Sequence, residues 1–183
     1  MDPIDILTEY YKPGSKAFDI LVAHGEQVAR KALATAERVV HLKPDLEFIE
    51  NAAMLHDIGI LETDSPELGC NGRHPYVCHG ILGRKMLESS GVPAYGPICE
   101  RHIGVGISAQ DVRQQNLPLP DRDMLPVSIE EQIICYADKF FSKNGSGRRA
   151  EEKSVEKIID GLQRYGPEKV KRFQRWVKMF EFE

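Results

Sequence analysis

The sequence predicts an all-α fold, a compact bundle of about seven helices. Apolar residues recur at spacings of three and four along most of the chain, which is the period of an amphipathic helix. Prolines, glycines and helix-capping residues divide this pattern into segments of helical length. Apolar and polar residues nowhere alternate over more than four positions, so no strand is predicted.

Two helices are predicted at the N-terminal end of the sequence. A short one begins at Pro3, because proline is tolerated in a first helical turn, and the Pro-Gly pair at 13–14 ends it. The second covers about residues 15–41. Pro44 follows it, and the residue before a proline is pushed out of the helical region.

Capping and breaking residues define the middle of the chain. Asp45 is the predicted N-cap of a third helix, and Gly59 is predicted to stop it. Residues 60–75 are rich in proline and glycine and are predicted to form a loop. Helix then resumes over about residues 76–90, and a short helix follows over 94–103.

The last part of the chain contains irregular and helical segments. Residues 104–126 have three prolines and no sustained period. Ser128 and Glu131 form a predicted capping box that opens a helix through about Ser142. A basic connection containing glycine and serine follows at 144–149.

Length and composition indicate one globular domain. The 183 residues match the usual size of about 100–200 residues per domain. The chain is 42% apolar and 28% charged, which is enough to bury a core. We therefore expect residues 1–183 to form a single domain, with two amphipathic helices over 150–183 packing on the rest.

Charge and cysteine content disfavour several functional classes. The net charge of −4 disfavours binding to an extended nucleic acid. No apolar run is long enough to span a membrane, and the N-terminus lacks the basic start and apolar core of a signal peptide. The four cysteines form no CxxC pair, which is typical of reduced thiols. We expect a cytoplasmic protein without a membrane partner.

Ionisable residues interrupt several apolar helical segments. His56 and Asp57 are adjacent at the end of a strongly apolar predicted helix, and others lie in two further helices. Burying such groups costs free energy unless they are paired or bind a metal. One ion would satisfy all of them, so the sequence predicts a metal site with four ligands: His24, His56, Asp57 and Asp138.

Mixed imidazole and carboxylate ligands favour a divalent transition metal over calcium or magnesium. We expect iron or manganese, with zinc, cobalt or nickel as alternatives. Such an ion lowers the pKa of bound water and polarises a phosphoryl oxygen, and Asp57 is the predicted catalytic residue. His79 and His102 exceed the needs of one ion. They would hold a second ion bridged by Asp57, which we favour, or orient a substrate phosphate on a single ion.

The sequence resembles the HD superfamily of metal-dependent phosphohydrolases, which is named for the pair that here is His56-Asp57. The motif HDIG at 56–59 and the order of the ligands carry the resemblance, which covers about residues 18–143. It implies the four ligands given above, and His79 and His102 match a subgroup of which some members hold two irons. The superfamily implies hydrolysis of a phosphoester or phosphoanhydride but names no substrate.

Side chains near these ligands are predicted to contact the substrate. The candidates are Lys139, Arg101 and His74. Many relatives continue HDIG with lysine, whereas this sequence has Ile60, so that phosphate contact must come from elsewhere or be absent. We expect the loop 60–75 and the stretch 104–126 to form the walls of the substrate pocket.

Two functions are compatible with these observations. The first is a phosphohydrolase that acts on a small metabolite, namely a nucleotide, a dinucleoside polyphosphate or a cyclic phosphate. The second is a catalytically inactive helical module that senses a nucleotide or a metal. The complete ligand set favours the enzyme, and Ile60 favours the sensor.

Overall fold

The structure is a computed structural model that describes residues 2–143 and 149–181. Within these residues the chain forms nine α-helices, so the predicted all-α fold is confirmed, although the predicted number of helices was too low. The helices are α1 (Pro3–Tyr10), α2 (Lys16–Arg38), α3 (Leu46–Leu55), α4 (His79–Ser89), α5 (Gly96–Arg101), α6 (Ala109–Gln114), α7 (Ile129–Asp138), α8 (Val155–Gln163) and α9 (Pro167–Glu181). In the described part of the chain, no helix is both long and apolar enough to cross a bilayer.

Side-chain caps begin α3 and α7 where the sequence predicts them. The Asp45 carboxylate accepts a hydrogen bond from the backbone N–H of Phe48 at 2.9 Å. The Ser128 hydroxyl accepts one from the N–H of Glu131 at 3.2 Å. The second bond of the predicted capping box differs, because Glu131 accepts from the N–H of Val127 at 2.6 Å instead of that of Ser128.

Two boundaries in the C-terminal half were predicted wrongly. The stretch 104–126 contains α6, which a capping box between Ser108 and Asp111 begins. The helix expected to reach about Ser142 ends at Asp138. After it the chain makes turns, in which the N–H groups of Phe140 and Phe141 donate to the carbonyl oxygens of Ala137 and Asp138.

The predicted loop 60–75 contains short ordered pieces. A 3₁₀ helix over Ile58–Glu62 runs into it, and two short strands pair antiparallel within it, β1 (Asp64–Ser65) and β2 (Cys70–Asn71). A further 3₁₀ turn, Tyr76–Cys78, leads directly into α4. This region links the end of α3 to the start of α4, and candidate ligands lie at both of these positions.

Gly59 has a different role from the predicted one. The third helix already ends at Leu55, and Gly59 lies within the following 3₁₀ helix. A Cβ atom at Gly59 would lie 2.1 Å from the carbonyl oxygen of His79 and 2.3 Å from the backbone nitrogen of Gly83. Glycine is therefore needed here for the close approach of this segment to α4.

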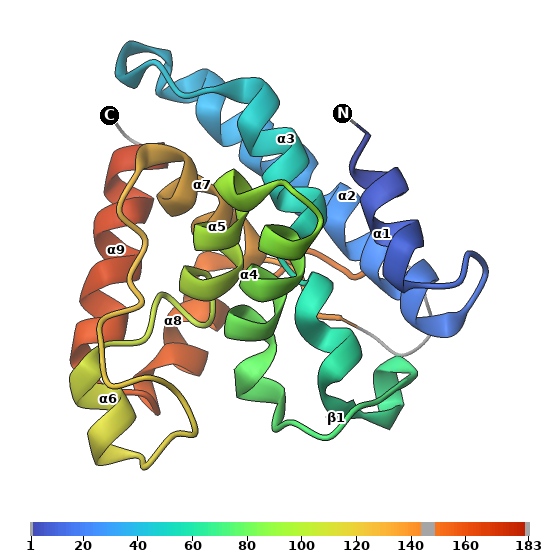
Figure 1. The fold of residues 1–183 in the computed structure, drawn as a ribbon. Helices are drawn as coiled ribbons and strands as arrows, with labels where there is room; N and C mark the ends of the chain where they lie inside the picture. The colour runs from blue at the N-terminus through green and yellow to red at the C-terminus, as the bar shows by residue number, and fades with distance from the viewer. Residues whose placement is uncertain (1, 144–148, 182–183) are drawn as a thin grey trace.

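The two C-terminal helices pack against the other helices. Phe173 and Phe180 of α9 contact Tyr136 of α7, with ring centroids 5.4 and 5.1 Å apart. Ile158 and Leu162 of α8 join the same core. Figure 1 shows α1 and α9 at opposite sides of the bundle, with α4 and α5 in the middle of the view.

Candidate metal centre

Five helices bring the six predicted ligands into one cluster. Every one of these side chains is at most 5% exposed. They come from the middle of α2 (His24), the turn directly after α3 (His56, Asp57), the first residue of α4 (His79), the C-cap of α5 (His102) and the last residue of α7 (Asp138).

Asp57 lies between two pairs of histidines. Its Oδ2 is 3.3 Å from Nε2 of His24 and 3.1 Å from Nε2 of His56. Its Oδ1 is 3.4 Å from Nε2 of His79 and 3.3 Å from Nε2 of His102. Each carboxylate oxygen thus faces one histidine pair, an arrangement that suits a carboxylate shared between two ions.

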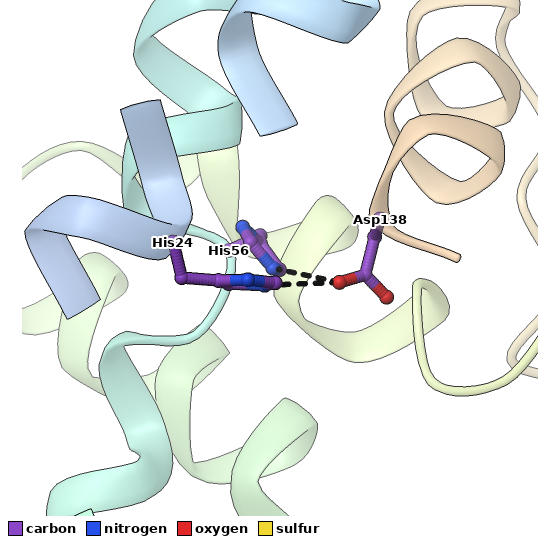
Figure 2. Close-up of side chains that lie close together, drawn as sticks. All are labelled: His24, His56 and Asp138. Atoms are coloured by element: carbon purple, nitrogen blue, oxygen red, sulfur yellow. Dashed lines mark hydrogen bonds and ion pairs between the residues drawn. The ribbon is translucent and has the colours of Figure 1, made fainter. Parts of the chain in front are cut away.

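Asp138 closes the first of these groups. Its Oδ1 is 3.0 Å from Nε2 of His24 and 3.6 Å from Nε2 of His56, and both rings point toward it (Figure 2). The ligand-type atoms of these three residues lie within 4.8 Å of one another. The same holds for His56, Asp57 and His102, so both groups could hold a metal ion.

Backbone carbonyls orient three of the four histidines. In each, Nδ1 donates to the carbonyl oxygen three residues earlier: His56 to Ala53 at 2.6 Å, His79 to Tyr76 at 2.6 Å and His102 to Cys99 at 2.8 Å. A ring nitrogen that donates carries the proton of the neutral imidazole. The Nε2 atoms of His79 and His102 therefore present lone pairs to the cluster, as metal ligands do.

The pair His79 and His102 is the clearest sign of a bound cation. Their Nε2 atoms are 3.1 Å apart, and two lone pairs at that distance repel unless a cation lies beside them. Among the described residues, the buried side-chain atoms without a hydrogen-bond partner include Nε2 of His56 and Oδ1 of Asp57. Such atoms are costly to bury, so this donor set fits a metal ion.

Most of the imidazoles are held in the neutral form. Burial lowers the pKa of His79 to about 3. Burial and the charge of Lys143 lower the pKa of His24 to about 4. His56 differs: burial disfavours its charged form, but the negative charges of Asp57 and Asp138 outweigh burial and raise its pKa to about 9. A metal ion bound at His56 must therefore displace a proton from that ring.

Two lysines balance the carboxylates. Nζ of Lys143 lies 2.7 Å from Oδ2 of Asp57, and Nζ of Lys139 lies 2.9 Å from Oδ2 of Asp138. Burial alone would raise the pKa of both carboxyl groups. The charges of His56 and Lys143 nevertheless hold the pKa of Asp57 well below its usual range, and the charge of Lys139 does the same for Asp138.

Lys143 was not among the residues predicted from the sequence. It has no motif of its own and follows the end of α7 in an irregular segment. Ile60, which stands where many relatives have lysine, is 1% exposed and belongs to the hydrophobic core. Lys143 thus places an ammonium group beside Asp57 from a different part of the chain.

Tyr11, just after α1, fixes the turn that follows the His-Asp pair. Its hydroxyl donates to the carbonyl oxygen of Ile58 and accepts from the N–H of Leu61, both at 2.7 Å. Burial raises the pKa of Tyr11, so the hydroxyl keeps the proton that it donates. This pair of bonds holds the 3₁₀ helix that contains Gly59.

An open pocket of about 610 Å³ reaches the cluster at Asp138. Most of its lining comes from the end of α7 and from α8 with the segment before it: Asp138, Lys139, Phe141, Ser142, Lys143, Lys153, Lys157, Ile158, Gly161, Leu162 and Arg164, together with Glu67, Leu68 and Tyr76. The loop 60–75 therefore contributes, as predicted. The stretch 104–126 does not, because it packs around a second small core of Ile107, Val112 and Met124.

One of the three predicted substrate-binding residues, Lys139, lines this pocket. Arg101 lies outside it and pairs with Glu131 at 2.8 Å, which joins α5 to α7. His74 is exposed and also lies outside the pocket lining. The basic side chains of the pocket come instead from the end of α7 and from α8.

The family model of the HD domain matches residues 20–142, and the chain therefore belongs to the HD domain family. Two curated relatives are named tRNA (cytidine(56)-2'-O)-methyltransferase. The protein of Thermoplasma volcanium is 28% identical over a match that covers 94% of this chain and 44% of the relative. The protein of Picrophilus torridus is 31% identical over a match that covers 69% of this chain and 33% of the relative. An uncharacterized protein of Methanocaldococcus jannaschii is 32% identical over 62% of this chain and 65% of its own length. The chain thus spans less than half of the two named relatives.

A solved structure has the same fold. It is the HD domain of the Listeria monocytogenes phosphodiesterase PgpH in complex with cyclic-di-AMP, and it matches with a TM-score of 0.52 over 98% of both chains. The sequences are 16% identical, so this likeness concerns the fold. Together with the family match, it confirms the HD superfamily fold for this chain.

The role of His102 can be tested by metal stoichiometry. If the two histidine pairs hold one ion each, we expect about two metal ions per chain in the wild type and about one in His102→Ala. Elemental analysis of protein purified under anaerobic, metal-replete conditions measures this. His41→Ala, a change at an exposed histidine, should keep the wild-type value. A wild-type content of one ion would instead assign His79 and His102 to orienting the substrate.

Proposed function

We propose that this chain is a metal-dependent phosphohydrolase that cleaves a phosphoester or phosphoanhydride of a small nucleotide with a metal-activated water. Two observations support the metal-binding part of this proposal. The Nε2 atoms of His79 and His102 lie 3.1 Å apart, and the Asp57 oxygens face both histidine pairs. The basic pocket that opens at Asp138 carries the phosphate part. Family membership supports both.

Each residue has a part in the proposed reaction. His24, His56 and Asp138 would hold one divalent ion, His79 and His102 a second, and Asp57 would contact both. When bound, such ions supply Lewis acidity toward a phosphoryl oxygen and lower the pKa of water. Because the histidine Nδ1 atoms are fixed by backbone carbonyls, the ligands need little reorganisation. Lys139 and Lys143 would compensate the negative charge of the phosphate.

The mixed nitrogen and oxygen ligands favour iron or manganese, with zinc, cobalt and nickel as alternatives. The cyclic-di-AMP bound to the PgpH domain is a small nucleotide, which agrees with the substrate class proposed here. The tRNA methyltransferases are matched over less than half of their length, and their name applies to the whole of those proteins. We therefore do not extend methyl transfer to this chain.

A sensor that binds nucleotide or metal without turnover is the competing hypothesis, and Ile60 in place of the familiar lysine is the observation in its favour. The position of Lys143 weakens that observation, since an ammonium group lies 2.7 Å from Asp57 without a lysine at position 60. Turnover separates the two hypotheses.

Metal removal tests the proposal directly. We expect hydrolysis of at least one member of a panel of nucleotides, dinucleoside polyphosphates and cyclic phosphates, with loss of activity on chelation and recovery with iron or manganese. A metal ion that binds only the folded state stabilises it, so chelation should also lower Tm by roughly 5–10 °C. Calorimetry measures Tm, and chromatography of the nucleotide products together with a phosphate assay measures hydrolysis. A metal-loaded protein that binds nucleotides but hydrolyses none of them would favour the sensor.

A further inference from the structure

The pocket beside the metal cluster carries more positive charge than the cluster requires. Its lining contains five cationic side chains and two carboxylates, Glu67 and Asp138. Lys139 and Lys143 are paired with the carboxylates of the cluster at 2.9 and 2.7 Å. Three cations remain, and they come from α8 and its flanks: Lys153, Lys157 and Arg164.

These three side chains have little to neutralise them within the described residues. None of the ion pairs found there includes Lys153, Lys157 or Arg164. The Nε of Arg164 donates a hydrogen bond to the carbonyl oxygen of Gly161 at 3.0 Å. This bond holds the guanidinium in place, and the uncharged carbonyl does not neutralise it. Burial and the charge of Lys139 lower the pKa of Lys153, as expected for an ammonium group among other cations. Lys153 is half-buried, whereas Lys157 and Arg164 are exposed at the mouth of the pocket, so the group attracts anions that enter from solvent.

The size of the pocket limits that anion. At about 610 Å³ it has the volume of a site for one small molecule. It also contacts the cluster, because Asp138, Lys139 and Lys143 lie in the same lining as the three cations of α8. A phosphate at the cluster and further phosphates along α8 would then belong to one molecule.

We propose that Lys153, Lys157 and Arg164 form a subsite for the phosphates that are not attacked, so that the substrate is a nucleotide with a chain of at least two phosphates. This inference rests on the proposed phosphohydrolase function and specifies its substrate class. A nucleoside monophosphate or a cyclic mononucleotide has a single phosphate group, which cannot lie at the cluster and at this subsite at once. Hydrolysis of a phosphoanhydride forms a P–O bond to the water oxygen and breaks the bridging P–O bond. The leaving phosphate keeps the electron pair, and the protons of water go to the products or to solvent.

Binding of inorganic tripolyphosphate and orthophosphate to the purified full chain tests the subsite without requiring turnover. The double variant Lys153→Ala/Lys157→Ala should weaken tripolyphosphate binding by about tenfold or more, because each ammonium group loses a charge-assisted contact. Its affinity for orthophosphate, which fits at the cluster alone, should change by less than about twofold. Calorimetric titration at fixed ionic strength gives both values.

Matched controls separate this effect from loss of charge in general. Lys12→Ala/Lys85→Ala removes two exposed lysines outside the pocket lining and should leave both affinities unchanged. Equal weakening of tripolyphosphate binding by both double variants would overturn the subsite. Tighter binding of a single-stranded RNA than of tripolyphosphate, with a steep salt dependence that the α8 variant removes, would overturn it in favour of a nucleic acid. Tripolyphosphate binding that depends on α8 in a protein without turnover would keep the subsite and reject the enzyme.

Discussion

Asp57→Asn should abolish phosphate release and reduce bound metal. The substitution keeps the size of the side chain but removes the charge that both histidine pairs face at 3.1–3.4 Å. Substitution of a residue that hydrogen-bonds to a metal ligand typically lowers metal affinity or activity about 10–100-fold. Loss of a ligand shared by both ions should therefore lower activity by at least about a hundredfold. Elemental analysis and a phosphate assay on the same preparation measure the two losses together.

A matched control for this variant is Asp64→Asn, which changes an exposed aspartate in β1. It should keep metal content and activity. Full metal occupancy with full turnover in Asp57→Asn would refute the proposed centre. Normal metal content with no turnover would limit Asp57 to a role in the reaction, since the remaining ligands would then suffice for binding.

Gly59→Ala is expected to destabilise the fold strongly, although it adds a single methyl group. The new Cβ would lie 2.1 Å from the carbonyl oxygen of His79 and 2.3 Å from the nitrogen of Gly83, both backbone atoms that cannot rotate away. Overpacking of a core lowers the free energy of unfolding by about 1–3 kcal/mol. A clash with backbone atoms at these distances should lower it by the upper value of that range or more. We expect a loss of about 3 kcal/mol and a Tm lower by roughly 10 °C, measured by thermal and denaturant unfolding.

Gly161→Ala provides the comparison for the same chemical change. Gly161 lies within α8, where a Cβ would meet only a guanidinium nitrogen of Arg164, at 4.0 Å. Alanine in a helix interior is favoured over glycine by about 0.5–1 kcal/mol, so this variant should be as stable as the wild type or more so. Similar stability of the two variants would show that the segment at Gly59 can shift away from α4.

The sequence was sufficient to find the six clustered residues. His24, His56, Asp57 and Asp138 are ionisable and lie in apolar helical segments, and His79 and His102 follow from the resemblance to the HD superfamily. Lys143 was not predictable in this way. If α7 had continued to Ser142 as expected, Lys143, five residues after Asp138, would have been rotated by roughly 140° around the helix axis from that aspartate. The helix ends at Asp138 instead, and the chain folds back so that Lys143 reaches Asp57.

The other differences also depend on tertiary contacts or short elements. Gly59 was taken as a helix stop because glycine commonly ends helices, whereas its role comes from α4, which lies twenty or more residues later in the sequence. The six residues of α6 are too few to show a helical period among the nearby prolines. Its capping pair, Ser108 and Asp111, was the available local signal.

The metal cluster and the cations of α8 come from separate stretches of the chain. All six cluster residues lie within 20–142, the part that matches the HD domain, whereas Lys153, Lys157 and Arg164 follow it. Charges on α8 can therefore be exchanged without altering a residue of the cluster, since the α8 residues that pack in or against the core, Val155, Ile158, Ile159 and Leu162, are all uncharged. An acidic or apolar α8 grafted onto the same helices would redirect the pocket toward cationic or uncharged ligands, so this helix is the natural place to engineer selectivity.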